Sequence, residues 1–333
     1  MSDRPLTLEA PDVQAQSPPL ALTLSRVGVT GVEKVIRVRQ QGVEQLFWAR
    51  LDCFVDLGPD QKGAHMSRFE EVVNEAIGEV VLGESTFRAE DLAQRVAELV
   101  RDRQGALRAE VTIAARYPEH KPAPVSAVNT QEIYTLYGKA LASERGTRRL
   151  VGVAAQGMTA CPCAQQLVSA AARTRLLDDG FSDSEIDRIF EAVPVATHNQ
   201  RGLGTLYIGA TEAGKLAIDA RTLLQIVENS MSSEIYELMK RVDEVAVVEK
   251  AHRRPRFVED CVREMIGGVV ATLPELPDDA FVSARQENLE TIHQHNVAAE
   301  RHGTLGELRR ELAGGDSPRH TTLREWLDGS GVV

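Results

Sequence analysis

The chain has 333 residues, of which 43% are hydrophobic and 26% are charged, and its formal net charge at pH 7 is −11. This length allows two compact domains with a sizeable core, whereas the acidic balance argues against a nucleic-acid-binding surface as the main activity. With no apolar run near the roughly 20 residues of a membrane span, no signal-peptide pattern and too few cysteines for a disulfide framework, we expect a cytoplasmic protein that binds neither nucleic acid nor membrane.

The first half of the chain shows the periodicities of a small module of strands and helices. Residues 1–20 contain Pro and Gln without periodicity, so we expect a disordered arm there. Alternation of apolar and polar residues predicts strands, and apolar residues three and four apart predict helices. These patterns predict, in chain order, a strand around 51–57, helices over 69–80 and 92–100, and antiparallel strands over 107–117 and 132–143.

The second half repeats this order. A strand over 150–155 is expected to pair with 204–210, and a polar helical insert, about 164–191, lies between them with Ser182 and Ser184 as candidate N-caps. The remaining patterns predict helices over 224–238 and 258–269 and a strand from 280 to 286 that continues past His295.

This doubling predicts an α+β fold with two copies of one β-β-α-α-β-β module, each burying its helices on one face of an antiparallel sheet. The first module is expected over 21–148 and the second over 149–313. Residues 314–333 are interpreted as a tail, in which Leu323, Trp326 and Leu327 offer apolar groups for docking.

Cysteine and histidine side chains form the most informative cluster of the sequence. Cys161 and Cys163, separated by one proline, and the later His198 are ligand types of a borderline-soft divalent metal. No second cysteine pair completes a closed structural site, and an incomplete ligand set is typical of a catalytic metal that must also bind water or substrate. Spacing alone also allows buried or redox-active thiols and an ordinary hydrogen-bonded histidine.

Several carboxylates accompany this cluster. Glu234 lies beside the apolar stripe of its predicted helix, from which it can reach a site at the sheet edge. Glu249 adjoins a strand-like apolar stretch at Val247 and Val248, where an unpaired buried carboxylate would be costly. We interpret three further acids as charges on solvated faces: Glu228, Glu237 and Glu244.

Glu290, His293 and His295 form a second cluster with acid–base character. In an extended segment the two histidines share a face, and in a turn Glu290 approaches His293. Imidazole titrates near neutrality and a carboxylate can orient it, which suits proton transfer. Two surface histidines without a catalytic role have the same spacing.

Two further segments carry groups that suit an anionic ligand. Ser67 and Arg68 open a predicted helix, whose N-terminus can bind phosphate, although an N-cap and an exposed arginine fit the same pattern. Asn199, Gln200 and Arg201 directly follow His198 and supply hydrogen-bond donors beside it. Such a string suits an anionic or heteroaromatic ligand.

Together these segments resemble the type IB GTP cyclohydrolase family over residues 24–312. The resemblance rests on seven ordered motifs: Gly63-Ala64-His65-Met66-Ser67-Arg68, Ala160-Cys161-Pro162-Cys163, His198-Asn199-Gln200-Arg201, Ser233-Glu234-Ile235-Tyr236, Lys240-Arg241-Val242-Asp243-Glu244, Phe257-Val258-Glu259-Asp260 and Glu290-Thr291-Ile292-His293-Gln294-His295. It implies two tunnelling-fold modules per subunit, a homotetramer with active sites at subunit interfaces, and conversion of GTP and water to a dihydroneopterin phosphate and formate, the first step of pterin and folate biosynthesis.

The resemblance also implies roles for individual residues. The metal ligands map to Cys161, His198 and Glu234, and one divalent metal per subunit is implied, with Fe(II) favoured over Mn(II) or Zn(II). The acid–base and substrate-contacting group maps to Cys163, Glu290, His293 and His295. Substrate binding maps to Glu249 for the purine and to His65, Ser67, Arg68, Gln200 and Arg201, with Arg68 and Arg201 as candidate phosphate clamps.

The long insert between Cys163 and His198 resembles the archaeal-type branch of the family, which is associated with ferrous iron and a 2′,3′-cyclic phosphate product. The residues do not decide between that product and 7,8-dihydroneopterin triphosphate. Two other hypotheses remain: another tunnelling-fold enzyme, such as a nitrile reductase with a cysteine nucleophile, and a non-catalytic scaffold stabilised by metal.

Overall fold

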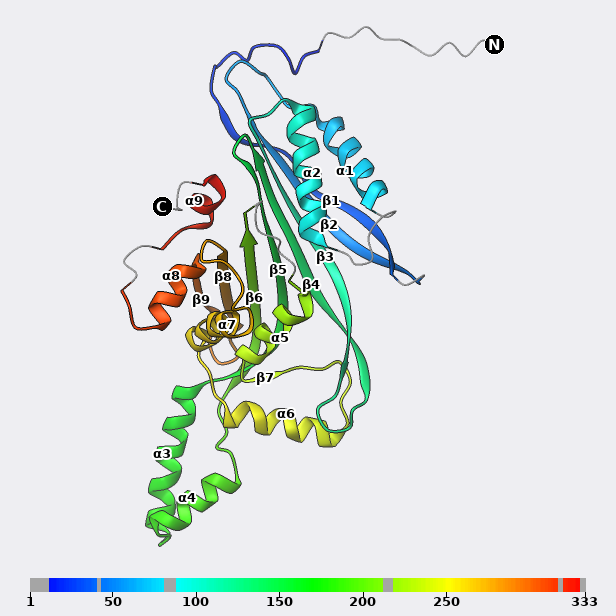
Figure 1. Ribbon diagram of the computed structural model, residues 1–333. Coiled ribbons are helices and arrows are strands. Elements are labelled where there is room, and N and C mark those ends of the chain that lie inside the picture. The colour runs from blue at the N-terminus through cyan, green and yellow to red at the C-terminus, as the bar shows by residue number, and fades with distance from the viewer. Residues whose placement is uncertain (1–11, 41–42, 81–87, 212–217, 317–319, 330–333) are drawn as a thin grey trace. The chain divides into compact units, whose positions relative to one another are not determined.

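The computed structural model describes residues 12–40, 43–80, 88–211, 218–316 and 320–329 (Figure 1). The chain divides into two compact units, one made of residues 1–113 with 138–147 and the other of residues 114–137 with 148–333. Strands β3 (Arg108–Pro122) and β4 (Asn129–Ser143) therefore contribute residues to both units. The predicted module boundaries at 21–148 and 149–313 stay a prediction.

In the first unit, helices α1 (Met66–Val80) and α2 (Ala89–Gln104) lie side by side (Figure 1) and pack against β1 (Leu24–Gln40) and β2 (Val43–Leu57). The strand order is β1-β2-β3-β4, and β1 pairs with β2 in antiparallel register. Apolar residues at helical and at alternating spacing meet in its core, as predicted. The core includes Leu51, Cys53, Val55, Phe69, Val72, Val73, Leu92, Val96 and Val100.

The sheet of the second unit places the candidate site. Beyond β4 the strand order is β5 (Gly146–Ala160), β6 (Asn199–Ala210), β8 (Phe281–Leu289) and β9 (Val297–Thr304), and the short β7 (Ser233–Glu234) pairs with β5. All these pairs from β5 onwards are antiparallel. The predicted pairing of 150–155 with 204–210 and the predicted α+β fold with antiparallel sheets are confirmed.

Helices α5 (Ala220–Ser230) and α7 (Val258–Thr272) pack against one face of this sheet. The sheet and α5 approach so closely that a Cβ at Gly204 would lie 2.5 Å from Val227 Cγ1. Glycine is therefore required at this point of β6. The opposite face of β6 carries the side chains of Arg201 and other residues that alternate with the buried ones.

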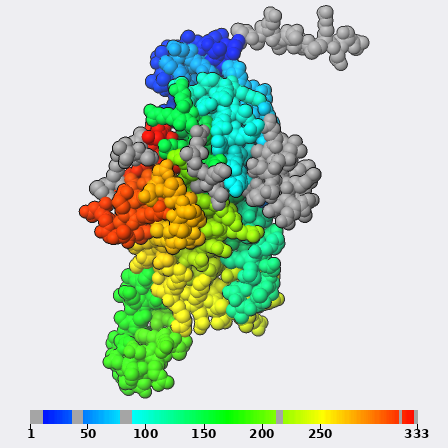
Figure 2. Space-filling view, in the orientation of Figure 1, coloured from blue at the N-terminus to red at the C-terminus, as the bar shows by residue number. Residues whose placement is uncertain are grey.

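The predicted helical insert contains α3 (Pro162–Asp178) and α4 (Asp183–Ala192), which form an arm that projects from the second unit (Figure 2). Ser182 is the N-cap of α4, as predicted, and it forms a capping box with Glu185. Of the helices in the described part of the chain, none is both long and apolar enough to cross a membrane.

The C-terminal tail docks through its predicted apolar residues. Helices α8 (Leu305–Leu312) and α9 (Leu323–Asp328) follow β9, and Trp326 of α9 is fully buried against Leu150 and Phe281. Its indole N–H donates a hydrogen bond to the Asp279 carbonyl, 2.9 Å away.

Three sequence expectations differ from the structure. The helix predicted over 224–238 ends at Ser230, because the buried Ser232 hydroxyl accepts a hydrogen bond from the Ala160 N–H and the next residues pair with β5 as β7. The strand predicted to run past His295 ends at Leu289, because β8 and β9 are antiparallel neighbours and the chain must turn between them.

The third difference is α6 (Arg241–Arg253), which includes the stretch around Glu249 that had been interpreted as strand-like. Its valines face both sides of a helix rather than alternating across a strand. Of the arm predicted over 1–20, residues 1–11 lie outside the described residues, and 12–20 contain neither helix nor strand.

Candidate active site

Cys161 and His198 become neighbours through the pairing of β5 with β6. Ala160 lies opposite Asn199 at the end of this ladder. One residue further on, the Cys161 N–H donates to the His198 carbonyl, 3.1 Å away, and the Thr197 hydroxyl donates to the Cys161 carbonyl, 2.9 Å away. The insert thus leaves and re-enters the sheet at one point, and its two ends carry the thiol and the imidazole.

Cys161 is also the N-cap of α3. Its Sγ accepts a hydrogen bond from the Ala164 N–H at 3.5 Å, and Pro162 occupies the first helical position, where its missing N–H is not needed. The exposed Cys163 follows in the first turn. Helix N-terminal amides favour negative charge, so this position suits a thiolate ligand.

Glu290 lies next to His198. Its Oε2 is 3.9 Å from His198 Nδ1, and the two side chains are only 6% and 15% exposed. Both of these atoms are buried without a hydrogen-bond partner among the described residues. The turn that begins at Glu290 is anchored to β6, since the Thr291 hydroxyl donates to the Asn199 carbonyl at 3.0 Å.

His293 and His295 lie in the same turn, so the segment is not extended, yet the two rings lie side by side. Their rings stack with centroids 5.2 Å apart and an interplanar angle of 15°. Both side chains are exposed. The turn therefore presents two imidazoles to solvent and keeps Glu290 buried beside His198.

Glu234 is placed by β7, opposite Gly157 of β5. Its two carboxylate oxygens accept hydrogen bonds from Lys250 Nζ at 2.8 and 2.6 Å. Burial by itself raises the pKa of Glu234, but the hydrogen bond and charge of Lys250 outweigh it, so the pKa is lowered and the carboxylate is charged at neutral pH.

Cys161 and His198 together fit a metal by the chemistry of their donor atoms, and the unpartnered His198 Nδ1 supports this. The three ligands implied by the resemblance, Cys161, His198 and Glu234, do not form one close group. No set of three or more His, Cys, Asp or Glu side chains within the described ranges is close enough to hold a metal ion. The backbones of Cys161 and His198 are in contact, whereas Glu234 is bound to Lys250.

Gln200 and Arg201 lie on opposite faces of β6. Gln200 is buried and its Oε1 has no partner in the described chain, whereas Arg201 is exposed and donates to Gln156 Oε1 at 2.7 Å. Arg201 lines a cavity of about 480 Å³. The charged and aromatic residues of its wall include Arg116, Arg285, Glu132, Glu228, Glu237, Glu287, Tyr134 and Tyr137.

Glu249 lies on the exposed side of α6. The buried side of this helix carries Asp243, Val247 and Ala251. Val242 and Val245, 54% and 59% exposed, share the outer side with Glu249 by helical spacing. The expectation that Glu249 adjoins a buried strand was therefore wrong.

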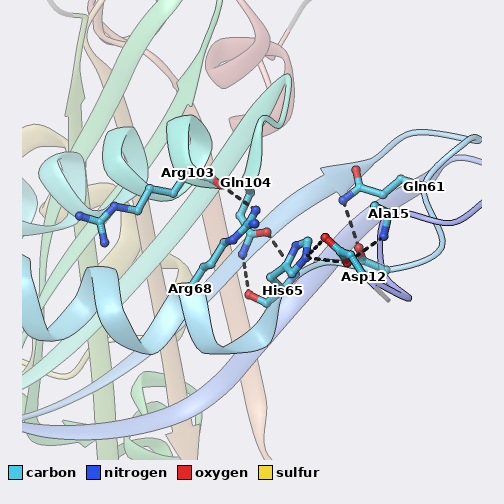
Figure 3. A network of polar contacts seen from close by, with 8 residues as sticks. Asp12, Ala15, Gln61, His65, Arg68, Arg103 and Gln104 are labelled. Atoms are coloured by element: carbon cyan, nitrogen blue, oxygen red, sulfur yellow. Dashed lines mark hydrogen bonds and ion pairs between the residues drawn. The ribbon is translucent and has the colours of Figure 1, made fainter. Parts of the chain in front are cut away.

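The remaining predicted residues belong to the first unit (Figure 3). His65 Nε2 lies 3.0 Å from both carboxylate oxygens of Asp12, and the side-chain amide of Gln104 bonds to both the N–H and the carbonyl of His65. Arg68 donates to the Arg103 carbonyl at 3.1 Å. Ser67 is exposed in the first turn of α1. His65 and Arg68 are thus tied to neighbouring segments.

Sequence reasoning missed one buried cluster. Glu228, interpreted as a solvated charge, is 9% exposed and accepts hydrogen bonds from Lys121 Nζ at 2.7 Å and the Tyr134 hydroxyl at 2.8 Å. Burial and the nearby carboxylate raise the pKa of Tyr134, which keeps its proton. The partners come from β3 and β4, so the spacing around Glu228 contains no signal of them.

Known proteins match this chain over most of its length. A family model described as type I GTP cyclohydrolase folE2 matches residues 10–299. The chain belongs to this family. It is therefore an enzyme of the GTP cyclohydrolase class, as the seven motifs predicted.

Several curated relatives carry the name GTP cyclohydrolase MptA. The protein from Methanococcus aeolicus is 42% identical over 308 residues, which cover 90% of this chain and 99% of the relative. A Methanococcus maripaludis protein is 40% identical over 312 residues, covering 92% and 98%. A Methanosarcina mazei protein is 39% identical over 317 residues, with the same coverage. These relatives confirm the archaeal-type resemblance.

Among solved structures, a hyper-thermostable uricase mutant matches with a TM-score of 0.52 and 7% identity, covering 94% of this chain and 99% of its own. At this identity the likeness shows the fold alone. The uricases share the tunnelling fold, which agrees with the tandem modules predicted from the doubled pattern.

Proposed function

We propose that this chain is a metal-dependent GTP cyclohydrolase, which converts GTP and water to a dihydroneopterin phosphate and formate at the start of pterin biosynthesis. The observation that carries the proposal is the meeting of Cys161, His198 and Glu290 at one end of β5, β6 and β8 in a chain of this family. A thiol and an imidazole can bind a metal that activates water, and a buried carboxylate can transfer protons, which suits hydrolysis of a purine ring.

The residues that would hold the metal are Cys161, His198 and Glu234, with Fe(II) favoured over Mn(II) or Zn(II). When bound, the metal supplies Lewis acidity that activates water near neutral pH. Cys161 and His198 are supported by their contact, whereas Glu234 rests on the family resemblance, since its carboxylate pairs with Lys250.

Proton transfer is assigned to the turn that follows β8. Glu290 is held beside His198, and the stacked rings of His293 and His295 lie within the same turn. In the proposed reaction these groups move protons at the guanine ring nitrogens while water adds to C8, a second water releases C8 as formate, and the ring closes through ribose carbons. The exposed Cys163 contacts substrate beside Cys161.

Substrate binding is assigned to two parts of the second unit. Arg201 lines the cavity of about 480 Å³ together with Arg116 and Arg285, and guanidinium groups suit the phosphates of GTP. Gln200 lies beside His198 in sequence and offers its amide to the base. Glu249 would accept the guanine N–H groups and fix the base, a positional contribution to the rate.

The outer side of α6 supports the proposed homotetramer. A carboxylate that binds a base must be shielded from water, yet Glu249 is exposed beside Val242 and Val245. A second copy packed on this side would shield it and complete the site. His65, Ser67 and Arg68 stay proposed substrate residues, at a helix N-terminus that favours phosphate. The four free cysteines agree with a proposed cytoplasmic location.

The decisive experiment incubates anaerobic, purified protein with GTP and Fe(II), Mn(II) or Zn(II), and measures formate and pterin fluorescence. Cys161→Ala should lose both metal and turnover, whereas Cys163→Ala should keep the metal and lose turnover. No turnover with any of the three metals would refute the proposal. Mass spectrometry of the pterin separates the triphosphate from the 2′,3′-cyclic phosphate.

A further inference from the structure

The Lys240–Glu244 motif, which opens α6, contains a fully buried carboxylate. Asp243 is 0% exposed and accepts hydrogen bonds from the N–H groups of Val125 and Ser126 at 2.9 and 2.8 Å. It also accepts from the Ser126 hydroxyl at 2.6 Å and from the Lys240 N–H at 2.8 Å. An unpaired buried carboxylate would be costly. The buried position of the Asp243 side chain is therefore stable only while these four hydrogen bonds are formed.

The charge of Asp243 follows from the same contacts. Burial by itself raises the pKa of Asp243, but the hydrogen bonds from Ser126, Lys240 and Val125 outweigh it and hold the pKa well below its usual range. The group is therefore a carboxylate at every pH at which the enzyme would work, and its hydrogen bonds are charge-assisted.

Three of the four hydrogen bonds come from the connection between β3 and β4, and the fourth comes from the N-cap of α6. Ala123 N–H donates to the Val128 carbonyl at 2.9 Å, and Ala127 between them has a positive φ of 55°. A residue other than glycine holds this conformation only where its surroundings fix it. The two amides that reach Asp243 are thus presented by a turn of fixed shape.

The same hairpin also holds the segment that leads into α6. The buried Glu132 of β4 accepts a hydrogen bond from the Glu237 N–H at 2.9 Å. The chain from β7 to α6 is therefore tied to β4 by Glu132 and to the β3–β4 turn by Asp243. Since α6 buries few other side chains, its N-terminal end depends on these polar contacts.

We propose that Asp243 is a positioning residue, which holds α6 against the β3–β4 turn. In this position of the helix, Glu249 is placed to bind guanine and Lys250 is placed to pair with Glu234. The assignment deepens the proposed function and rests on it. Asp243 does not face the substrate, because it lies on the buried side of α6 and Glu249 lies on the exposed side. Its effect on the reaction passes through the position of the helix.

The chain offers a matched control in Asp260. This residue occupies the corresponding position in the first turn of α7, where it accepts a hydrogen bond from the Phe257 N–H at 3.0 Å. Its side chain is 39% exposed, its other bond is to Arg263 of the same helix, and α7 carries no predicted site residue. Asp260→Asn weakens a helix cap without loosening a second segment.

Hydrogen exchange tests the positional claim without turnover. Asp243→Asn should raise the exchange rates of amides in 123–128 and 241–253 by about tenfold or more, since it replaces charge-assisted bonds by weaker ones. Ser126→Ala, which keeps the carboxylate and removes one donor, should give about a threefold increase in the same segments. Wild-type protection of both segments in Asp243→Asn, or in Ser126→Ala if Asp243→Asn does not fold, would overturn the claim.

Steady-state kinetics test its consequence. Asp243→Asn and Ser126→Ala should raise the KM for GTP more than they lower kcat, with about a tenfold rise for the former, whereas Asp260→Asn should leave both constants within about twofold of wild type. Equal falls in kcat for Asp243→Asn and Asp260→Asn at unchanged KM would contradict a positioning role. If wild-type protein does not turn over GTP, the proposed function fails while the exchange data still decide whether Asp243 holds α6.

Discussion

Two histidines of the family motifs, His65 and His198, each lie beside a carboxylate, and the two pairs differ in geometry. In the first unit His65 Nε2 is 3.0 Å from both oxygens of the exposed Asp12. In the second unit His198 Nδ1 is 3.9 Å from Oε2 of Glu290, and both of those atoms are buried without a partner in the described chain. The close pair holds two segments together through His65 Nε2, although His65 Nδ1 is itself buried without a partner in the described chain, whereas in the open pair both facing atoms stay available for a ligand.

The difference shows why a histidine motif alone does not reveal a role. His65 and His198 both stand in motifs of the family, yet the contacts of His65 tie its backbone and its ring to Gln104 and Asp12 (Figure 3). Buried polar atoms that lack hydrogen-bond partners are unfavourable for stability and are typical of functional sites. We therefore expect changes in the open pair to affect activity, and changes in Asp12 and Gln104, the partners of His65, to affect stability.

The largest expected effect is that of Glu290→Gln on turnover. The amide keeps the shape of the side chain but cannot accept a proton, so kcat should fall by about 10²- to 10⁴-fold, as measured by formate release from GTP. Glu300→Gln is the matched control, because Glu300 also lies beside a histidine, His302, at 3.1 Å, but its side chain is 47% exposed and lies outside the proposed substrate cavity. Similar losses in the two variants would remove the distinction between Glu290 and an ordinary exposed acidic residue.

The next effect concerns the close pair. Gln104→Ala removes two hydrogen bonds to the His65 backbone, at 3.2 and 2.8 Å, from a buried site. It should lower the free energy of unfolding by about 2 kcal/mol in a urea titration. Gln94→Ala serves as control, since the Gln94 amide bonds to Glu98 within the same helix. An unchanged unfolding midpoint for Gln104→Ala would show that these bonds do not fix His65.

A smaller effect of opposite sign is expected for the stability of Glu290→Gln. Replacing a buried carboxyl group whose Oε2 lacks a hydrogen-bond partner in the described chain should raise the free energy of unfolding by about 1 kcal/mol in the metal-free protein. Urea unfolding in the presence of a chelator measures this. A clear loss of stability would mean that Glu290 already has a structural partner, and the open pair would then be a structural feature.

The smallest effect is the pH dependence of the close pair. The hydrogen bond from His65, followed by that from Ala15, lowers the pKa of Asp12 below its ordinary value of 3.8. A lowered pKa stabilises the fold above the unfolded-state value, and this contribution is lost as pH falls through the folded-state pKa. Asp12→Asn should therefore be slightly less stable than wild type above about pH 4, and the difference should shrink at lower pH. A difference in thermal unfolding that grows below pH 4 would contradict the assignment.

Much of the fold follows from local pattern. Alternation in β3 and the helical spacing of Phe69, Val72 and Ala76 in α1 match the structure because each segment buries one face against one partner layer. The pattern failed at α6, where Val242 and Val245 face outward and few side chains are buried, so no apolar stripe indicates a helix. Polar contacts of Asp243 define its start, and they come from distant residues.

The site was predicted only in part for a related reason. Sequence spacing indicated that Cys161 and His198 are metal-ligand types, but their contact depends on the β5–β6 register and on the insert. The approach of Glu290 to His198 depends on the β6–β8 register, which no motif specifies. Glu228 was assigned to the surface because its partners lie on other strands. Family resemblance supplied roles where spacing left alternatives open.

X-ray absorption of the metal-loaded protein tests the central claim most directly, because it counts the sulfur ligands of the bound ion. We predict a spectrum with sulfur and with nitrogen or oxygen neighbours, in which the sulfur signal disappears in Cys161→Ser and persists in Cys163→Ser. A sulfur signal that persists in Cys161→Ser and disappears in Cys163→Ser, or a wild-type spectrum without sulfur, would contradict the assignment of the metal to Cys161 and His198.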